Sequence, residues 1–231
     1  MLNLKNNKLF SRYKGILILL VLVVFFWGVF KILTPQNFGS WENLFSYMQS
    51  SLMYSVGACG FYFIIIMGLF DFSLGANIVL SGILGCVFSY QFGYFGLIIA
   101  PIICGTLIGF INGFLYTRLK IPSIITTIGL SLIYESLGAV IAGGKIQILD
   151  KQYQIFGSSP ANILLAFFMF FLASVLLKYT KIGTYTYAIG SNEFIAKSIG
   201  INVNKYKIIA FMLLGFFGGV MSILAVSYGT S

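Results

Sequence analysis

The side chains able to carry out acid–base or metal chemistry are few and widely spaced in this sequence. Histidine is absent, which removes the commonest general base and proton switch. The three cysteines lie in apolar stretches without metal-ligand spacing, so we expect them to be small buried packing residues. The carboxylates do not pair in the sequence; they are Glu42, Asp71, Glu135, Asp150 and Glu193. We therefore expect no catalysis by this chain alone, no bound cofactor and no metal site.

A polar break interrupts a long apolar stretch at residues 68–77. It contains Asp71, Ser73 and Asn77, with Gly75 among them. One interpretation is a plain cytoplasmic turn in which Asp71 or Ser73 caps the next helix. The other is a discontinuous helix whose freed backbone groups line a cavity, which would place Asp71, Ser73 and Asn77 on a substrate pathway. The two interpretations are compatible.

Polar residues also recur along one side of the apolar segment 121–142. At about 100° per residue they fall within an arc of about 120° on a helix; they are Ser123, Thr127, Ser131, Tyr134, Glu135 and Gly138. A polar stripe should face the bundle interior or water, because facing lipid is unfavourable. Glu135 lies about 20 Å from the start of the helix, where it either reaches the outer headgroups or lines a pathway. We favour the pathway and predict Thr127, Ser131 and Glu135 as its residues.

The longest polar stretch is the loop at about 178–207. Ser191 or Asn192 can cap a short helix that carries Glu193 in its first turn, and Gly200 suits the helix end. Phe194, Ile195 and Ile199 would give this helix an apolar side. A helix this short cannot cross a bilayer, so it either lies on the membrane surface or docks into a protein partner.

These residues are set in a chain made for a lipid environment. It is 59% hydrophobic and only 8% charged, against about 25% charged residues in a soluble domain. Apolar segments of about 20 residues can each span a bilayer as a helix. Seven are present, at roughly 15–33, 47–69, 75–91, 93–117, 121–142, 161–177 and 208–227. The predicted fold is an all-α polytopic transmembrane helical bundle of about seven spans, with close glycine packing at Gly105, Gly109 and Gly113.

The basic residues predict the orientation of these spans. With a cytoplasmic amino terminus, the inside holds Lys5, Lys8, Arg12, Lys14, Arg118, Lys120, Lys178, Lys181, Lys197, Lys205 and Lys207, and the outside holds Lys31, Lys145 and Lys151. This bias favours a basic cytoplasmic segment at 1–14 followed by a transmembrane domain at 15–231. Because the net charge of +9 lies between the spans, it indicates membrane orientation, and we expect no nucleic acid partner.

Several motifs, in one order, resemble the permease subunits of ribose-type ABC sugar importers. Phe70-Asp71-Phe72-Ser73-Leu74-Gly75 resembles an Ile-Asp-Leu-Ser-Val-Gly signature, and Asn112-Gly113 followed by 120–129 resembles Asn-Gly…Pro-Phe-Ile-Val-Thr-Leu-Gly. The loop matches best: Gly183 to Asn192 resembles Gly-x-x-x-Tyr-Ala-Ile-Gly-Gly-Asn, and Ala196 to Val203 resembles Ala…Ser-Gly-Ile-Asn-Val. Together the motifs cover roughly residues 45–231.

The resemblance implies a multi-pass protein of a bacterial-type cytoplasmic membrane with several partners. A cytoplasmic ATP-binding subunit would hold ATP and Mg²⁺ and contact the loop; the matching residues are Tyr187, Ala188, Gly190, Asn192, Ala196 and Gly200. An extracytoplasmic sugar-binding protein would deliver the solute to a dimer of two permease copies. Family members often carry arginine where this chain has Glu135, and they continue past a seventh span, so the resemblance implies a permease truncated at its carboxyl terminus.

Two other functions stay open from the residues. An ion-coupled secondary transporter would use Asp71 or Glu135 as a proton relay, and a truncated chain would be a membrane protein that transports nothing. The sequence contains no Gly-x-x-x-x-Gly-Lys-Ser/Thr motif, as expected if ATP binds a separate subunit. The solute itself is not specified beyond a small polar molecule.

Overall fold

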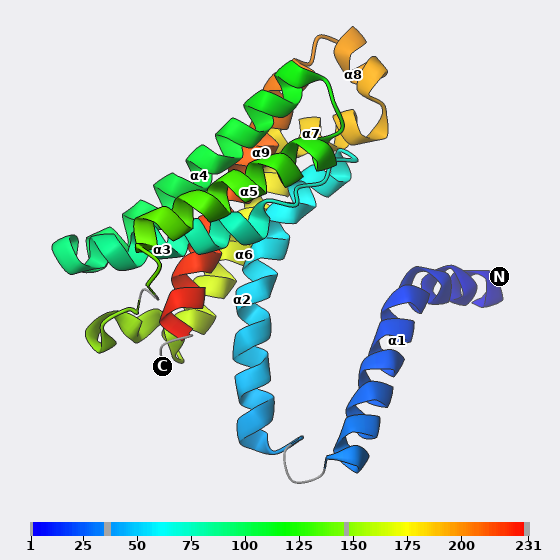
Figure 1. Ribbon diagram of the computed structural model, residues 1–231. Helices are drawn as coiled ribbons and strands as arrows, with labels where there is room; N and C mark the ends of the chain where they lie inside the picture. Colours follow the sequence, from blue (N-terminus) through cyan, green and yellow to red (C-terminus); the bar gives the residue numbers. More distant parts are fainter. Residues whose placement is uncertain (1, 35–37, 146–147, 229–231) are drawn as a thin grey trace. The chain divides into compact units, whose positions relative to one another are not determined.

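The computed structural model describes residues 2–34, 38–145 and 148–228, with side chains from Lys14 onward (Figure 1). Within these ranges the secondary structure is helical, and seven helices are long and apolar enough to cross a membrane. The chain divides into two compact units, residues 1–48 and 49–231. The predicted all-α polytopic bundle is confirmed.

The first unit holds α1 (Leu2–Leu33) and the first turns of α2 (Trp41–Ile66). Its connection is fastened by Phe38, whose ring lies 5.6 Å from that of Phe30 and 5.7 Å from that of Tyr47. Lys31 Nζ donates a hydrogen bond to the carbonyl oxygen of Phe38 at 3.0 Å. From Lys14 to Leu33, α1 is an apolar helix of membrane-spanning length, as predicted.

The second unit contains the remaining helices. They are α2 from Gln49 onward, α3 (Leu74–Phe92), α4 (Tyr94–Leu119), α5 (Ser123–Ala142), the 3₁₀ helix η1 (Lys151–Gly157), α6 (Ala161–Tyr179), α7 (Lys181–Ser191), α8 (Glu193–Ser198) and α9 (Val203–Tyr228). The predicted spans coincide with these helices. The largest differences are at the starts of α2 and α9, because Trp41 and Val203 begin helices several residues before the apolar runs.

Helix α9 is the central element, and its closest neighbour is α4. Glycines let the two backbones touch: a Cβ on Gly215 would lie 2.0 Å from the carbonyl oxygen of Gly105, and one on Gly109 would lie 2.2 Å from that of Phe211. Small residues at four-residue spacing permit such crossings in membranes, where dispersion between close backbones replaces the hydrophobic effect. The predicted glycine packing of α4 is therefore confirmed, with α9 as its partner.

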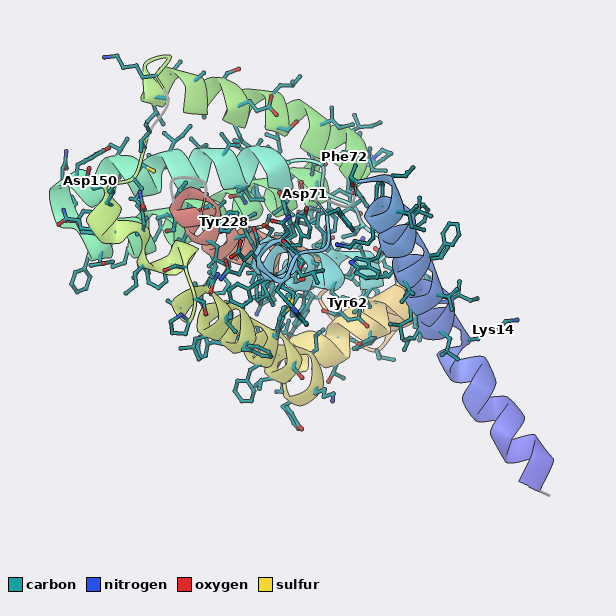
Figure 2. The ribbon with its side chains drawn as sticks, turned by 90° about the horizontal axis from the view of Figure 1, so that it is seen from below. Lys14, Tyr62, Asp71, Phe72, Asp150 and Tyr228 are labelled. Atoms are coloured by element: carbon teal, nitrogen blue, oxygen red, sulfur yellow. The ribbon has the colours of Figure 1, made fainter. Side chains whose placement is uncertain are left out.

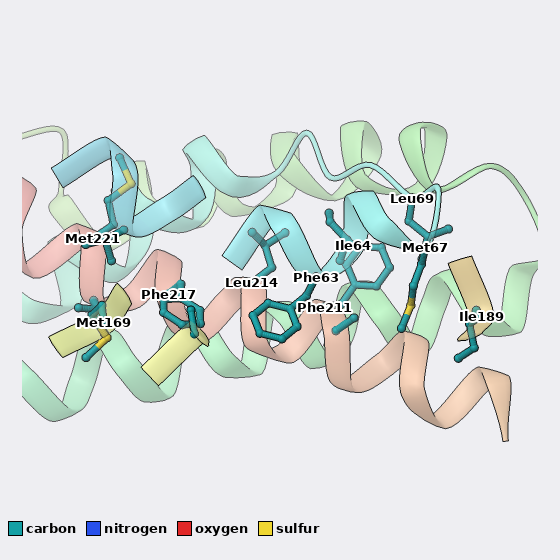
Figure 3. Close-up of a cluster of buried hydrophobic side chains, with 14 of the residues drawn as sticks. Phe63, Ile64, Met67, Leu69, Met169, Ile189, Phe211, Leu214, Phe217 and Met221 are labelled. Atoms are coloured by element: carbon teal, nitrogen blue, oxygen red, sulfur yellow. The ribbon is translucent and has the colours of Figure 1, made fainter. Parts of the chain in front are cut away.

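A hydrophobic core forms on the other side of α9, against α2, α6 and α7 (Figure 3). The rings of Phe63 and Phe217 stack with their centroids 6.3 Å apart. Phe63, Phe211 and Phe217 are fully buried. This core fixes the end of α2, and so the start of the polar break that follows it.

Helices α7 and α8 lie at one end of the second unit, and the carboxyl end of α9 lies at the other (Figure 1). We call the first the basic end, because it holds Arg118, Lys120, Lys178, Lys181, Lys197, Lys205 and Lys207. Helix α7 and η1 were not predicted, because neither contains an apolar run of membrane-spanning length; Ile182, Tyr185 and Ile189 of α7 do recur at helical spacing. Helix α7 forms through packing: Ile189 is buried, and a Cβ on Gly183 would lie 2.0 Å from the carbonyl oxygen of Leu177.

Candidate functional site

In the structure the polar break is shorter than residues 68–77: it is the seven-residue segment between Ile66, where α2 ends, and Leu74, where α3 begins. The segment runs beside the first turns of α5, whose hydroxyls accept its backbone N–H groups. Phe70 N donates to Ser123 Oγ at 3.1 Å, and Phe72 N donates to Thr127 Oγ1 at 3.0 Å. Ser123 and Thr127 lie one helical turn apart on α5, and their hydroxyls accept alternate N–H groups of the break. These two donors of the break are thus satisfied by side chains of α5.

Asp71 is the buried carboxylate of this break, with 3% of its surface exposed (Figure 2). Its Oδ1 accepts hydrogen bonds from the backbone N–H and the hydroxyl of Ser73, both at 2.7 Å. The first of these is an Asx turn, which fixes the chain at the entry to α3. Burial raises the pKa of the Asp71 carboxyl, and the hydrogen bonds from Ser73 and Asn112 act in the opposite direction.

Asn112 of α4 joins Asp71 to α5. Its Nδ2 donates to Asp71 Oδ2 at 2.9 Å and to Ser73 Oγ at 2.6 Å, while its Oδ1 accepts from Tyr134 OH at 2.8 Å. Asp71, Ser73, Asn112 and Tyr134 are all buried, and we call them the polar network. A buried network with its hydrogen bonds satisfied specifies one arrangement of the elements that it joins. Here it holds together the break, α4 and α5.

The other predicted pathway residues fall into two groups. Thr127 lies beside the break through its bond to Phe72 N, and Asn77 is buried one turn along α3, where it accepts a hydrogen bond from Ser81 Oγ at 2.9 Å. Ser131 is half-buried and bonds the carbonyl of its own helix at Ile128, and Glu135 is exposed. The structure therefore gathers Asp71, Ser73 and Thr127, and places Ser131 and Glu135 on the open side of α5.

Glu135 carries a charge within the membrane-spanning length of α5, Ser123–Ala142. Among the residues that the structure describes, it forms no ion pair. A carboxylate at this depth requires water or a polar partner from another molecule. Its assignment to a pathway stays a prediction.

At the basic end, Asn192 begins α8 as predicted. Asn192 Oδ1 accepts the backbone N–H of Ile195 at 3.0 Å, which is the hydrogen bond of an N-cap. The helix ends at Gly200 with φ +89°: Gly200 N donates to Lys197 O, and Ile201 N donates to Ala196 O. This is a Schellman arrangement, which requires a left-handed residue where glycine stands. The short helix and both of its terminal residues are confirmed.

The remaining loop residues position α7 and α8. A Cβ on Gly190 would lie 2.0 Å from the carbonyl oxygen of Ile66, and Ala196 is 1% exposed. Ala188 is half-buried on α7. The hydroxyls of Tyr187 and Tyr62 lie 3.4 Å apart, and that hydrogen bond raises the pKa of Tyr187. These residues hold α7 and α8 against the other helices of the second unit.

Large apolar side chains on α8 and at its carboxyl-terminal cap are exposed, beside the exposed Glu193, Lys197 and Ser198. Phe194 is 78% exposed, Ile195 57% and Ile199 69%. These side chains lie outside the seven candidate spans. An exposed apolar cluster on a polar end of a protein marks an interaction surface.

One residue of the basic end escaped sequence reasoning. Lys207 reads as an orientation charge, yet it is 7% exposed and its Nζ lies 2.8 Å from Glu193 Oε2. The signal was present, because Val203, Lys207 and Phe211 repeat every four residues and so share the buried face of α9.

Comparison with known proteins identifies the family of this chain. Residues 43–231 match the sequence model of a family described as branched-chain amino acid transport system / permease component. The chain belongs to this permease family. Since its relatives are permeases and its helices are of membrane-spanning length, it is a multi-pass protein of the cytoplasmic membrane.

Curated relatives carry sugar-import names. The ribose import permease protein of Haemophilus influenzae is 26% identical over an alignment of 238 residues, gaps included. The alignment covers 97% of this chain and 72% of the relative. That of Escherichia coli K12 is 26% identical, covering 93% of this chain and 68% of the relative. The L-arabinose transport system permease protein of E. coli K12 is 30% identical over 84% of this chain and 62% of the relative. No solved structure matches the chain.

Proposed function

We propose that this protein is the membrane-spanning permease subunit of an ATP-driven importer for a monosaccharide or a similar small polar solute. The family match over residues 43–231, with curated relatives named ribose and L-arabinose permeases, carries the proposal. The fold supports it: spans enclose a polar network, and a short helix projects from the basic end.

The basic end is the proposed contact for a cytoplasmic ATP-binding subunit. Phe194, Ile195 and Ile199 on α8 supply exposed apolar side chains, which an apolar groove on a partner can bury. ATP and Mg²⁺ would be held by that partner. A conformational change driven by hydrolysis there would be transmitted to the spans through α7 and α8, which pack on the bundle at Gly190 and Ala196.

The solute pathway is proposed along the open side of α5. Ser131 and Glu135 lie on that side, and a second permease copy facing it would enclose them in a polar channel. Asp71, Ser73, Asn77 and Thr127 lie deeper, where they set the position of α5 against α3 and α4. An extracytoplasmic sugar-binding protein would supply the solute at the opposite end.

The test of the docking surface compares two exposed phenylalanines at opposite ends of the second unit. Phe194→Ser removes an anchor that is 78% exposed on α8, and Phe95→Ser removes one that is 74% exposed at the start of α4. Each variant would be purified together with the ATP-binding subunit and the sugar-binding protein of a monosaccharide importer. We expect Phe194→Ser to lose the ATP-binding subunit and ATP-dependent uptake, and Phe95→Ser to keep the ATP-binding subunit. Full retention of the ATP-binding subunit by Phe194→Ser would contradict docking at α8.

A further inference from the structure

Helix α8 is fastened to the bundle by few side chains. Ala196 is its one buried residue, because Glu193, Phe194, Ile195, Lys197 and Ser198 are all exposed. Its charged attachment is the ion pair from Glu193 Oε2 to Lys207 Nζ at 2.8 Å. Glu193 is 56% exposed at its side chain and Lys207 only 9%, so the pair joins the surface of α8 to the interior of the bundle.

The buried end of this pair also contacts α4. Lys207 Nζ lies 5.4 Å from the ring centroid of Tyr116 and 3.4 Å from its hydroxyl oxygen. These two distances place the ammonium beyond the hydroxyl edge of the ring, so the hydroxyl oxygen is the atom of Tyr116 that attracts it. The Tyr116 ring in turn packs on Phe211, with centroids 5.7 Å apart. One ammonium group therefore contacts α8 and α4 while it is carried by α9.

Helices α4 and α9 are in close backbone contact at this level. A Cβ on Gly113 would lie 2.8 Å from Ile208 Cα, so the two backbones touch beside Lys207. Close-packed interiors transmit displacement because they have little free volume to absorb it. A force on α8 that is transferred through Lys207 would move α4 and α9 together. Asn112 of the polar network lies one turn along α4 from Tyr116, so the same displacement would reach α5.

We propose that Lys207 is a positioning residue that transmits movement of α8, caused by the ATP-binding subunit, to the α4–α9 pair. The proposal rests on the proposed importer function. Removing the Glu193 carboxylate leaves a buried ammonium without its anion, which weakens the seat of α8. Without the link, α8 moves with its partner while the spans do not, so ATP is hydrolysed with less solute imported.

The variants are Glu193→Gln, Lys207→Met and Lys207→Arg, with Lys205→Met as the matched control, because Lys205 is on the same helix but exposed. Each would be reconstituted with both partner subunits, and the number of sugar molecules imported per ATP hydrolysed would be measured. We expect this ratio to fall at least about five-fold in Glu193→Gln and Lys207→Met, the lower end of coupling between sites. Lys205→Met should match the unchanged protein, and Lys207→Arg should restore most of the ratio.

The outcomes separate the two proposals. An unchanged chain that imports no sugar with ATP would refute the importer function itself. An unchanged chain that imports sugar, with Glu193→Gln at the same ratio, would refute the link through Lys207. Uptake and hydrolysis that fall in parallel would also overturn it, since they indicate a structural role. If Lys207→Met fails to fold, Glu193→Gln still tests the link, because Glu193 is exposed and its replacement leaves the buried packing unchanged.

Discussion

Replacement of Asn112 by leucine should destabilise the second unit strongly. Asn112 makes three side-chain hydrogen bonds, to Asp71, Ser73 and Tyr134. Leucine has a similar size, so the main loss is polar: Asp71 Oδ2 and the Tyr134 hydroxyl are left buried without partners. Each orphaned group costs about 1–3 kcal/mol, which gives a destabilisation of about 2–6 kcal/mol.

The substitution Tyr134→Phe removes the donor of the hydrogen bond between Tyr134 and Asn112. Interhelical hydrogen bonds in membrane proteins contribute about 0.6 kcal/mol on average and about 1.7 kcal/mol at most. We expect Tyr134→Phe to destabilise the original chain by that amount. In the Asn112→Leu background it should be neutral or stabilising, because it removes a hydroxyl that no longer has an acceptor. Tyr54→Phe, at a tyrosine that is 62% exposed, is the control and should change nothing.

Thermal or SDS-induced unfolding in detergent, followed by circular dichroism, measures these differences. Tryptophan fluorescence is unsuitable, since Trp27 and Trp41 both lie in the first unit. A double-mutant cycle then isolates the coupling between Asn112 and Tyr134. If Tyr134→Phe destabilises both backgrounds equally, the two side chains do not interact and the polar network is wrong.

Four further substitutions, one of them a control, test the packing, the α8 cap and the pathway. Gly215→Ala would place a Cβ 2.0 Å from the Gly105 carbonyl oxygen, and overpacking of about 1–3 kcal/mol should exceed the gain of about 1 kcal/mol in helix propensity. Gly129→Ala enters open space and should leave the unfolding temperature unchanged or raised; equal effects of the two would contradict the α4–α9 contact. Asn192→Ala removes the α8 cap, worth about 1 kcal/mol, so amide hydrogen exchange in α8 should accelerate, and unchanged exchange would deny the cap a role. Glu135→Gln should raise the KM for uptake without changing the unfolding temperature, and an unaltered KM would remove Glu135 from the pathway.

The spans and the short helix α8 could be predicted because their signals are local. Hydrocarbon runs define the helices, and Asn192 and Gly200 satisfy the ends of α8 within a few residues of the chain. The polar break was also visible, since Asp71 and Ser73 stand out in an apolar stretch.

The roles of the polar residues required the three-dimensional arrangement. Ser123 and Thr127 read as one stripe with Glu135, yet they bind backbone N–H groups of a segment more than fifty residues away, at Phe70 and Phe72. In the sequence, Asn112 was recognised only as part of a motif, and its hydrogen-bond partners could not be predicted. Partners so distant in the sequence leave no periodic signal. Helix α7 carries a local signal, since Ile182, Tyr185 and Ile189 recur at helical spacing, but its contacts with Ile66 and Leu177 could not be read from it.

We propose that ATP hydrolysis on the cytoplasmic side of the membrane drives a small polar solute inward through this permease. The most direct measurement is uptake of labelled ribose or L-arabinose by proteoliposomes containing the chain, its ATP-binding subunit inside and its sugar-binding protein outside. We predict accumulation against a gradient that requires ATP and both partner subunits, and that is unaffected when the proton gradient is collapsed. Accumulation that follows the proton gradient and ignores ATP would refute ATP-driven import and indicate an ion-coupled transporter.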